Sequence, residues 1–384
     1  MAHNSISFLA ALQALDHGDH GDHTLHGDFI ARSGAPSGGA SALVMSHAVL
    51  SGPWMWDQKD RPDHLPFDAA SNAQLWAADV RTMVAQQEIG SSVRVTATPG
   101  GGGALPTVSV STTTGSAHPL IAALERPDAD TFAAQLDLLE FYADQRVERL
   151  PEIILELSDI ISNFAAIVPL RPERKRWTLE YIRICLRAIS LVEMQVKHIM
   201  ACRRPVDFHA QVQPMIQTPQ HSALPAGHAA EAFLVSTLLR HFAETAAIAR
   251  NAAGEAGWFA KADRMLLRQA ARIAQNRVVA GVHFPIDNAC GAVLGVSFAE
   301  YLLALSQGPA GTVTTAQGRS FVAGGYGGAD FTHETAAGLY GAGALHTSEG
   351  DVYSESHAVE LTPPDNLVLG EIYRAAAAEW QDPA

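Results

Sequence analysis

The sequence has few cysteines, few basic residues and no uninterrupted apolar run of membrane-spanning length. Three cysteines (Cys185, Cys202 and Cys290) among 384 residues are too few, and odd in number, for a disulfide framework. The first residues lack the basic start of a secretory signal. The apolar stretch 289–305 carries Glu300 and falls short of a membrane span. We therefore expect a cytoplasmic protein without a membrane span.

Positive charge is also scarce. The chain has 26 Lys and Arg against 40 Asp and Glu, a formal net charge of −14. Such a surface repels nucleic acid, so we expect no nucleic-acid partner. Apolar residues make up 47% of the chain and charged residues 17%, which predicts a folded protein with a sizeable core. A cluster of basic residues in so acidic a chain therefore calls for a specific explanation.

The pattern along the chain predicts three regions. Residues 1–125 form an N-terminal extension, in which alternation at 93–96 and 107–110 predicts a small β-hairpin. Residues 126–306 show helical periodicity and form the expected catalytic core. Residues 307–384 are rich in glycine at first and are expected to be a loop region followed by one packing helix. The predicted fold class is all-α, a helical bundle with a small hairpin and Gly-rich extensions. The predicted helices cover residues 131–150, 152–167, 173–202, 229–250, 260–275, 287–305 and 367–380.

Two short motifs in the helical region carry groups suited to binding an anion. Lys197 and Arg204 are seven residues apart, two helical turns, so both cations can project from one face before Pro205 ends the helix. The segment Leu224–His228 reads Leu-Pro-Ala-Gly-His and precedes a predicted helix. Backbone N–H groups at a helix start favour a negative charge, and a histidine there can transfer a proton. Either motif alone is more often a solvated helix face or a simple turn.

A third motif combines a cation with a paired imidazole. Arg277 offers a planar fork of donors for a tetrahedral oxyanion. His283 can attack phosphorus or ligate a metal through one ring nitrogen. Asp287, four residues later, can hold the other ring nitrogen and so fix its tautomer. A buried histidine with only a structural role would not need an arginine and an aspartate at these spacings.

Together the three motifs, Lys-x6-Arg-Pro, Pro-x-Gly-His and Arg-x5-His-x3-Asp, occur once each and in that order. In this the chain resembles the superfamily that joins type 2 phosphatidic acid phosphatases, soluble bacterial acid phosphatases and vanadium-dependent haloperoxidases. The resemblance covers 197–287 by motif, and 128–306 by helical pattern. It implies the helical bundle of that superfamily.

The resemblance implies a role for each cation and backbone donor. Lys197, Arg204 and Arg277 would hold the equatorial oxygens of phosphate or vanadate. The loop residues Ala226 and Gly227 would border the same oxyanion, with the N–H of Gly227 as a further donor.

It also implies the roles of the histidines. His228 would be the acid–base residue. His283 would be the phosphatase nucleophile or, equally, the metal ligand of vanadate, with Asp287 orienting its ring. His221, seven residues before His228, matches a second active-site histidine of the bromoperoxidases, although it can also be an ordinary loop residue.

Two positions depart from the superfamily pattern. Ala226 stands where the phosphate-binding loop usually has a serine, so one hydroxyl donor to the oxyanion is missing. Losing such a donor can cost about 2–4 kcal/mol of transition-state stabilisation. Asn276 stands where a serine usually precedes the arginine of the third motif, and an amide can still donate a hydrogen bond.

Three functions follow from these motifs. The first is a haloperoxidase that oxidises halide with hydrogen peroxide at a vanadate cofactor. The alternative is a phosphatase that hydrolyses phosphate monoesters through a phosphohistidine, with phosphate in the place of vanadate. The third is a non-catalytic oxyanion-binding protein. His221 and the missing export signal favour the first function, whereas the phosphatase-like sequence Gly281–Pro285 and Ala226 favour the second. We expect small-molecule substrates and a homo-oligomer in either case.

Overall fold

The structure, a computed structural model, describes residues 64–115, 118–250, 255–308 and 312–381. The chain divides into two compact units, residues 1–81 and 82–384. The described part of the first unit contains the 3₁₀ helix η1 (Ala70–Leu75) and the start of α4 (Ala78–Ser92), which continues into the second unit. The candidate motifs all lie in the second unit.

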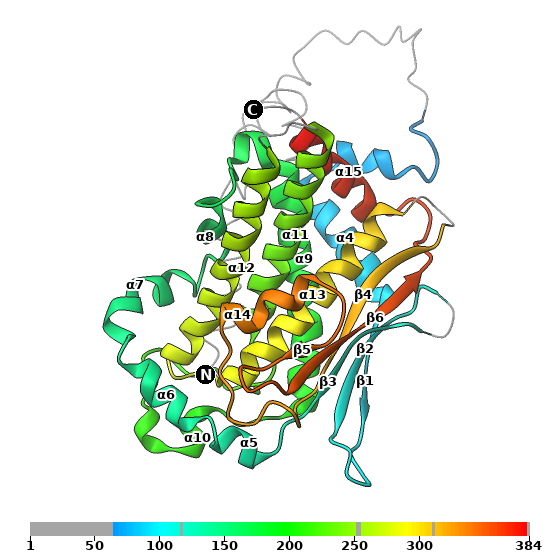
Figure 1. Cartoon of the computed structure of the whole chain (residues 1–384). Coiled ribbons are helices and arrows are strands. Elements are labelled where there is room, and N and C mark those ends of the chain that lie inside the picture. Colours follow the sequence, from blue (N-terminus) through cyan, green and yellow to red (C-terminus); the bar gives the residue numbers. More distant parts are fainter. Residues whose placement is uncertain (1–63, 116–117, 251–254, 309–311, 382–384) are drawn as a thin grey trace, which may run out of the picture. The chain divides into compact units, whose positions relative to one another are not determined.

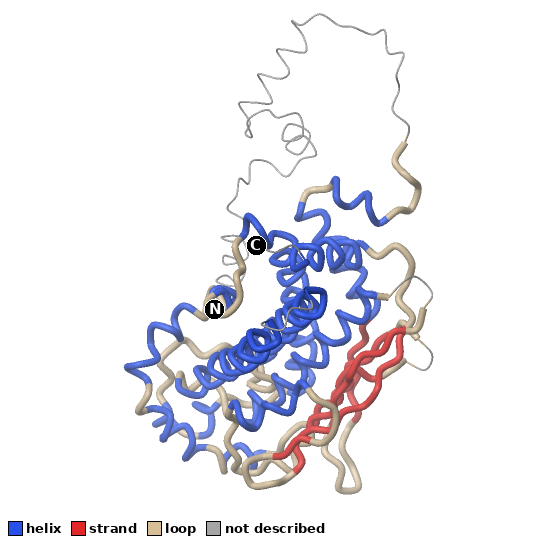
Figure 2. The backbone as a smooth tube through the Cα atoms, turned by 45° about the horizontal axis from the view of Figure 1, so that its top comes forward, coloured by secondary structure: helices blue, strands red, loops and turns tan. Residues whose placement is uncertain are grey.

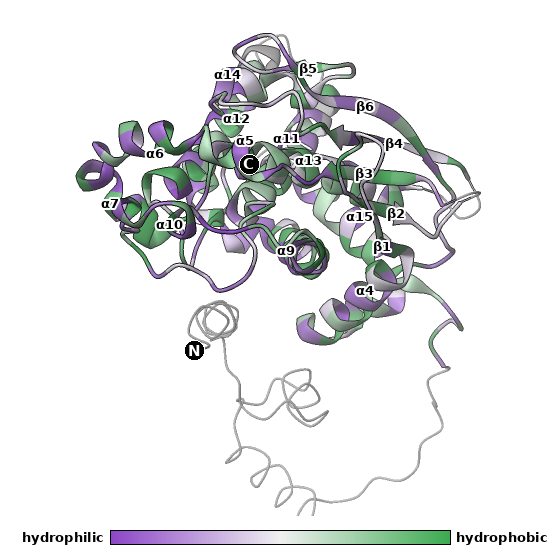
Figure 3. Cartoon of the chain, turned by 90° about the horizontal axis from the view of Figure 1, so that it is seen from below, coloured by the Kyte–Doolittle hydropathy of each residue, from purple (hydrophilic) through white to green (hydrophobic). Residues whose placement is uncertain are grey.

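Helices make up most of the second unit (Figure 1). Four of them are long: α9 (Pro172–Met200), α11 (Gly227–Arg250), α12 (Glu255–Val279) and α13 (Pro285–Gln307). The others are α5 (Ala129–Ala133), α6 (Leu136–Ala143), α7 (Arg146–Leu155), α8 (Ile161–Ala165), α10 (Pro205–Phe208), η2 (Ala210–Val212), α14 (His333–Ala336), η3 (Ala337–Tyr340) and α15 (Val368–Gln381). Hydrophobic and hydrophilic residues are interspersed along α6 and α7 (Figure 3).

The sequence specifies where the helices that carry the motifs begin and end. Pro172 and Pro285 occupy the first turns of α9 and α13, where the missing N–H costs nothing. Helix α9 stops at Ala201, which adopts left-handed backbone angles (φ 48°, ψ 39°). The carboxylate of Asp287 accepts a hydrogen bond from the backbone N–H of Phe284 (2.9 Å) and so caps α13.

Helix α13 forms the centre of the core. It contacts α9, α11, α12 and α15 on the helical side and β3, β4 and β6 on the sheet side. It is long and apolar enough to cross a membrane, by length and composition alone, but 94% of its most apolar window is buried inside the fold. Such a helix is weak evidence for a membrane span, because a core helix has the same length and composition.

Helices α11 and α13 approach closely at two glycines. A Cβ built on Gly291 would lie 2.4 Å from the carbonyl oxygen of Ala226, and a Cβ on Gly295 would lie 2.3 Å from that of Ala230. Real Cβ atoms do not approach an oxygen this closely, so a side chain at either position would force the two helices to shift. The contact holds the start of α11, and with it Gly227, against the start of α13.

A six-stranded mixed sheet lies along one side of the helices (Figure 2). Its strand order is β1-β2-β3-β4-β6-β5. Only β3 and β4 pair in parallel, and the other neighbours are antiparallel. The strands are β1 (Val93–Thr98), β2 (Thr107–Thr112), β3 (Leu120–Glu125), β4 (Thr314–Phe321), β5 (Leu345–His346) and β6 (Val352–Leu361).

The prediction of an all-α fold is therefore wrong. The expected hairpin, β1 and β2, is one end of a larger sheet that takes further strands from both extensions. Strands β4 and β6 are polar, and β4 contains Gly318 and the buried Arg319, so they lack the apolar alternation that predicts a strand. The pairing of β3 with β4 joins segments almost 200 residues apart in the sequence, which local patterns do not reveal.

Candidate oxyanion site

The three motifs lie at helix ends. Lys197 is in the last turn of α9, and Arg204 immediately precedes α10. His228 is the second residue of α11. Arg277 is in the last turn of α12, and His283 stands two residues before α13. The free N–H groups and positive dipole ends of α11 and α13 favour an anion beside them.

His283 is held from both sides. Its Nδ1 lies 3.1 Å from Oδ2 of Asp287, and its Nε2 lies 2.9 Å from Nη1 of Arg204. Because a guanidinium can only donate, Nε2 accepts that bond and Nδ1 carries the ring proton toward the carboxylate. Burial and the charge of Arg204 hold the pKa of His283 well below its usual range. A neutral ring with its lone pair on Nε2 is the form that can bond to phosphorus or vanadium.

Arg204 organises the loop around this histidine. It donates from Nη1 to the carbonyl of Val282 (2.8 Å) and from Nη2 to that of Ser222 (3.2 Å). Its Nε donates to the carbonyl of His221 (3.1 Å), and Nη2 also reaches Nδ1 of that histidine (3.2 Å). All five N–H donors of Arg204 therefore face acceptors within the protein. Burial lowers the pKa of Arg204 to about 10 and that of His221 to about 4.

Lys197 is also buried and holds the same loop. Its ammonium donates to the carbonyl of Pro225, and the carbonyls of Ser222 and Ala223 lie 3.3 and 3.4 Å away. The carboxylate of Glu193, one turn earlier on α9, is 3.7 Å from it. Burial lowers the pKa of Lys197 to about 8. Its positive charge therefore lies directly beneath the loop that leads into Gly227.

Arg277 has hydrogen-bond donors that no acceptor uses among the described residues. Its Nη2 is 2.5 Å from Oε2 of Glu156, while its Nε and Nη1 are buried and have no hydrogen-bond partner in the described part of the chain. Buried, unsatisfied donors on a cation are costly, and an oxyanion would satisfy both at once. Asn276, the second departure from the superfamily pattern, donates to Oε1 of Glu156 (2.7 Å) and so supports the same ion pair.

His228 is positioned by a backbone carbonyl. Its Nε2 lies 3.0 Å from the carbonyl oxygen of Glu156, so Nε2 carries the hydrogen and Nδ1 carries the lone pair. Burial, with the charge of Arg277 next in importance, holds its pKa well below the usual range. A bound dianion would raise this pKa and allow Nδ1 to hold a proton.

Ala226 and Gly227 lie where the loop meets the start of α11. Ala226 is buried, and its N–H donates to the carbonyl of Asp287 (2.8 Å). Gly227 begins α11, so its N–H lacks an intrahelical partner. The structure thus gathers Lys197, Arg204, Ala226, Gly227, His228, His283 and Asp287 around one place, and Arg277 joins them through Glu156 and His228. His221 borders this group through Arg204.

The sequence reasoning missed three glutamates near the site, of which Glu156 and Glu193 are buried and Glu231 is partly buried. Glu156 follows α7, and burial raises its pKa to about 7. Glu231 lies on α11, accepts a hydrogen bond from Ser190 (3.2 Å), and has its pKa raised to about 8 by burial. Glu193 is paired with Lys197. Glu231 is three residues after His228 on α11, and Glu193 is four residues before Lys197 on α9. These helical spacings place both glutamates on the same helix faces as the motif residues. Nothing in the motifs pointed to Glu156.

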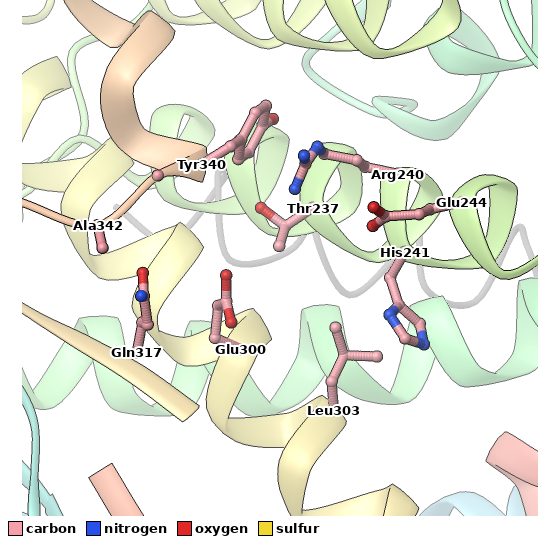
Figure 4. Close-up of a pocket in the computed structure, with 10 residues that line it drawn as sticks. Thr237, Arg240, His241, Glu244, Glu300, Leu303, Gln317, Tyr340 and Ala342 are labelled. Atoms are coloured by element: carbon pink, nitrogen blue, oxygen red, sulfur yellow. The ribbon is translucent and has the colours of Figure 1, made fainter. Parts of the chain in front are cut away.

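A cavity lies elsewhere on α11, about three turns beyond His228 (Figure 4). Its volume is about 350 Å³, and Thr237 of α11 and Glu300 of α13 both reach it. Arg240, which also lines it, is paired with Asp263 at 2.5 Å. The other lining residues are His241, Glu244, Leu303, Gln317, Tyr340, Gly341 and Ala342. The cavity contains no residue of the three motifs, so it is separate from the oxyanion site.

A comparison with protein families agrees with the motifs. The family model described as PAP2 superfamily matches residues 178–308, about a third of the chain, and this segment contains all three motifs. A search of curated proteins finds no match. Among solved structures, the chain is similar to a transmembrane PAP2 type phosphatidylglycerolphosphate phosphatase from Bacillus subtilis. The two share 16% sequence identity with a TM-score of 0.26, over 44% of this chain and 78% of that chain. Residues 178–308 of this chain are therefore similar to the PAP2 superfamily, as the three motifs predict.

Proposed function

We propose that this protein hydrolyses phosphate esters, with phosphomonoesters as the simplest substrates, through a phosphohistidine at His283. The observation that carries the proposal is the position of His283: one ring nitrogen on Asp287, the other free of a proton and beside Arg204. The unused donors of Arg277 support it further. They can donate hydrogen bonds to the phosphoryl oxygens.

In the first step, Nε2 of His283 forms a bond to phosphorus while the bond from phosphorus to the ester oxygen breaks. Asp287 stabilises the positive charge that develops on the ring. Arg277, Arg204 and the N–H of Gly227 offset the charge on the phosphoryl oxygens. His228, whose pKa is raised by the bound dianion, delivers the proton on Nδ1 to the departing alkoxide.

In the second step, water attacks the phosphohistidine. His228, now neutral, takes a proton from that water at Nδ1, and the bond from phosphorus to Nε2 breaks. Inorganic phosphate leaves, and His283 regains its lone pair. As phosphate leaves, His228 returns to solvent the proton that it took up when the dianion bound, so each turnover consumes one ester and one water and leaves every side chain in its starting protonation state.

Halide oxidation is the second candidate function, because His221 lies against Arg204 at the edge of the same site. The donor set also fits vanadate: Arg277, Arg204 and Gly227 would hold its oxygens and His283 its metal. Bound vanadate would supply a Lewis acid for the oxidation of halide by hydrogen peroxide. Non-catalytic oxyanion binding, a cytoplasmic location and a homo-oligomeric state stay predictions from the sequence.

Two assays on one preparation test the proposal. We expect hydrolysis of p-nitrophenyl phosphate, and no bromide-dependent bromination of a phenol dye with hydrogen peroxide, with or without added vanadate. The variant His283→Ala should lose hydrolysis by at least about a thousandfold, because the covalent route is closed. Bromination that requires vanadate, without ester hydrolysis, would support the second candidate. Turnover in neither assay would support a non-catalytic oxyanion-binding protein.

A further inference from the structure

A carboxyl group lies against the loop that would bind the oxyanion. Glu193 is 3% exposed, and its Oε1 is 3.7 Å from the ammonium of Lys197. A Cβ built on Gly227 would be 2.4 Å from Oε1 and 3.1 Å from Oε2, so the carboxyl group faces this glycine directly. Its Oε2 is buried and has no hydrogen-bond partner among the described residues. One carboxyl oxygen is therefore unused beside the residue whose N–H would bind an anion.

An ionised carboxylate in this position would repel an oxyanion. The groups that face Glu193 are Lys197 on its own helix, Arg204 after that helix, and Glu231 from α11. Burial raises the pKa of Glu193 and the two cations oppose this change. An arriving anion adds a like charge next to the carboxylate, which favours the protonated form further. Protonation turns an acceptor that repels the anion into an O–H donor that binds it.

We infer that Glu193 takes up a proton when the oxyanion binds and donates to it the O–H hydrogen bond that Ala226 cannot supply. The inference rests on the oxyanion site of the proposed function. Ala226 and Gly227 are adjacent, so Glu193 reaches from α9 to the part of the loop where the superfamily usually has a serine hydroxyl. The proton comes from solvent and returns to it when the anion leaves.

The first test is the pH dependence of sulfate binding, measured by titration calorimetry between pH 5.5 and 8.5. Sulfate stays a dianion throughout this range, so any proton taken up belongs to the protein. We expect the slope of log Kd against pH to be smaller by about one in Glu193→Gln than in the wild type, because the amide donates an N–H at every pH. Glu300→Gln is the matched control and should keep the wild-type slope, because burial also raises the pKa of Glu300 but this carboxyl group lines the separate cavity.

The second test separates the donor from the charge. Glu193→Ala removes both, so at pH 5.5 it should bind sulfate on the order of tenfold more weakly than the wild type or Glu193→Gln. Adding Ala226→Ser to Glu193→Ala should restore most of this loss, because the serine supplies a hydroxyl at the same loop. Thermal unfolding of each variant shows whether it is folded.

Equal slopes in the wild type and Glu193→Gln, or undiminished binding by Glu193→Ala at pH 5.5, would overturn the inference and leave the proposed function intact. Failure of the wild type to bind sulfate or phosphate at any pH would overturn both.

Discussion

Nη1 of Arg204 lies 2.9 Å from Nε2 of His283, the atom that would form the bond to phosphorus. The lone pair of the nucleophile is thus occupied by a hydrogen bond until the oxyanion arrives. Binding must move this donor from the ring to an oxygen of the substrate. Arg204 therefore holds the tautomer of His283 before the reaction and stabilises the phosphoryl oxygens during it.

Replacing Arg204 with lysine should damage both roles. Lysine has three donors on one atom, whereas Arg204 uses five to hold three carbonyls and two histidines. We expect Arg204→Lys to lower kcat/KM for a phosphomonoester by about a hundredfold or more. We also expect it to lower the free energy of unfolding by about 2–4 kcal/mol, because buried carbonyls lose their donors. The exposed neighbour Arg203 provides the control, since Arg203→Lys should change neither quantity appreciably. A fully active Arg204→Lys enzyme would contradict the account.

Asp287 can be tested against a second aspartate in the same structural position. Both Asp287 and Asp207 are the third residue of a helix that begins with proline, and both accept a backbone N–H. Asp287 alone also contacts a catalytic ring nitrogen. We expect Asp287→Asn to lower kcat by about a hundredfold to ten-thousandfold, because the neutral amide no longer stabilises the charged ring. Asp207→Asn should keep kcat near the wild-type value, and steady-state kinetics on both variants decides the point.

Alanine variants at the two glycines between α11 and α13 should distinguish an effect on stability from an effect on activity. Alanine at Gly291 would press on the carbonyl of Ala226, and alanine at Gly295 on that of Ala230, at almost the same short distance. Each variant should lose about 1–3 kcal/mol of unfolding free energy through overpacking. Only Gly291→Ala should also displace Gly227, so its kcat/KM should fall at least about tenfold while that of Gly295→Ala stays within about threefold. Equal activity in the two variants would show that the position of Gly227 is not critical.

The candidate site was largely predictable from sequence because its residues come in short motifs that end or begin helices. Pro205 and Pro285 mark two of these ends, and the spacing from His283 to Asp287 brings the two side chains together within one helical turn. The motifs thus predicted the contacts within each segment. That Arg204 would lie against His283 followed only from the resemblance to a family.

Two kinds of feature were not predictable. The sheet depends on pairing between β3 and β4, which are almost 200 residues apart in the sequence, and its later strands are polar enough to resemble loops. The buried glutamates are the second kind. Glu156 reaches Arg277 from a short helix remote in sequence, and neither residue carries a local signal of the pairing.

Glu156 should give the stability of the protein a measurable dependence on pH. Its pKa in the fold is about 7, above the ordinary value of 4.5 for a glutamate, because burial disfavours the charged form. A raised pKa gives stability that is complete below about pH 4.5 and is lost as the pH rises through about 7. The shift corresponds to about 3 kcal/mol. Between pH 5 and 8, the unfolding free energy of Glu156→Gln should therefore fall less steeply than that of the wild type, as denaturant titrations can measure.

Glu152 should give stability the opposite dependence on pH in the same experiment. Its hydrogen bond with Arg272 is the largest cause that lowers its pKa, so its contribution is present at neutral pH and is lost as the pH falls. Glu152→Gln should therefore lose stability near pH 7, relative to the wild type, and lose less near pH 4. If the unfolding free energies of Glu156→Gln and Glu152→Gln changed with pH in the same way, Glu156 would not be held in a disfavoured charged state.

Capture of the phosphorylated enzyme tests the central claim most directly. The protein would be mixed with a phosphomonoester, quenched at high pH within milliseconds to preserve a phosphorus–nitrogen bond, digested and mapped by mass spectrometry. We predict one acid-labile phosphate on His283 during turnover, absent from His283→Ala and formed normally in Gly295→Ala. Turnover with the phosphate on another residue, or with undiminished activity in His283→Ala, would contradict the account.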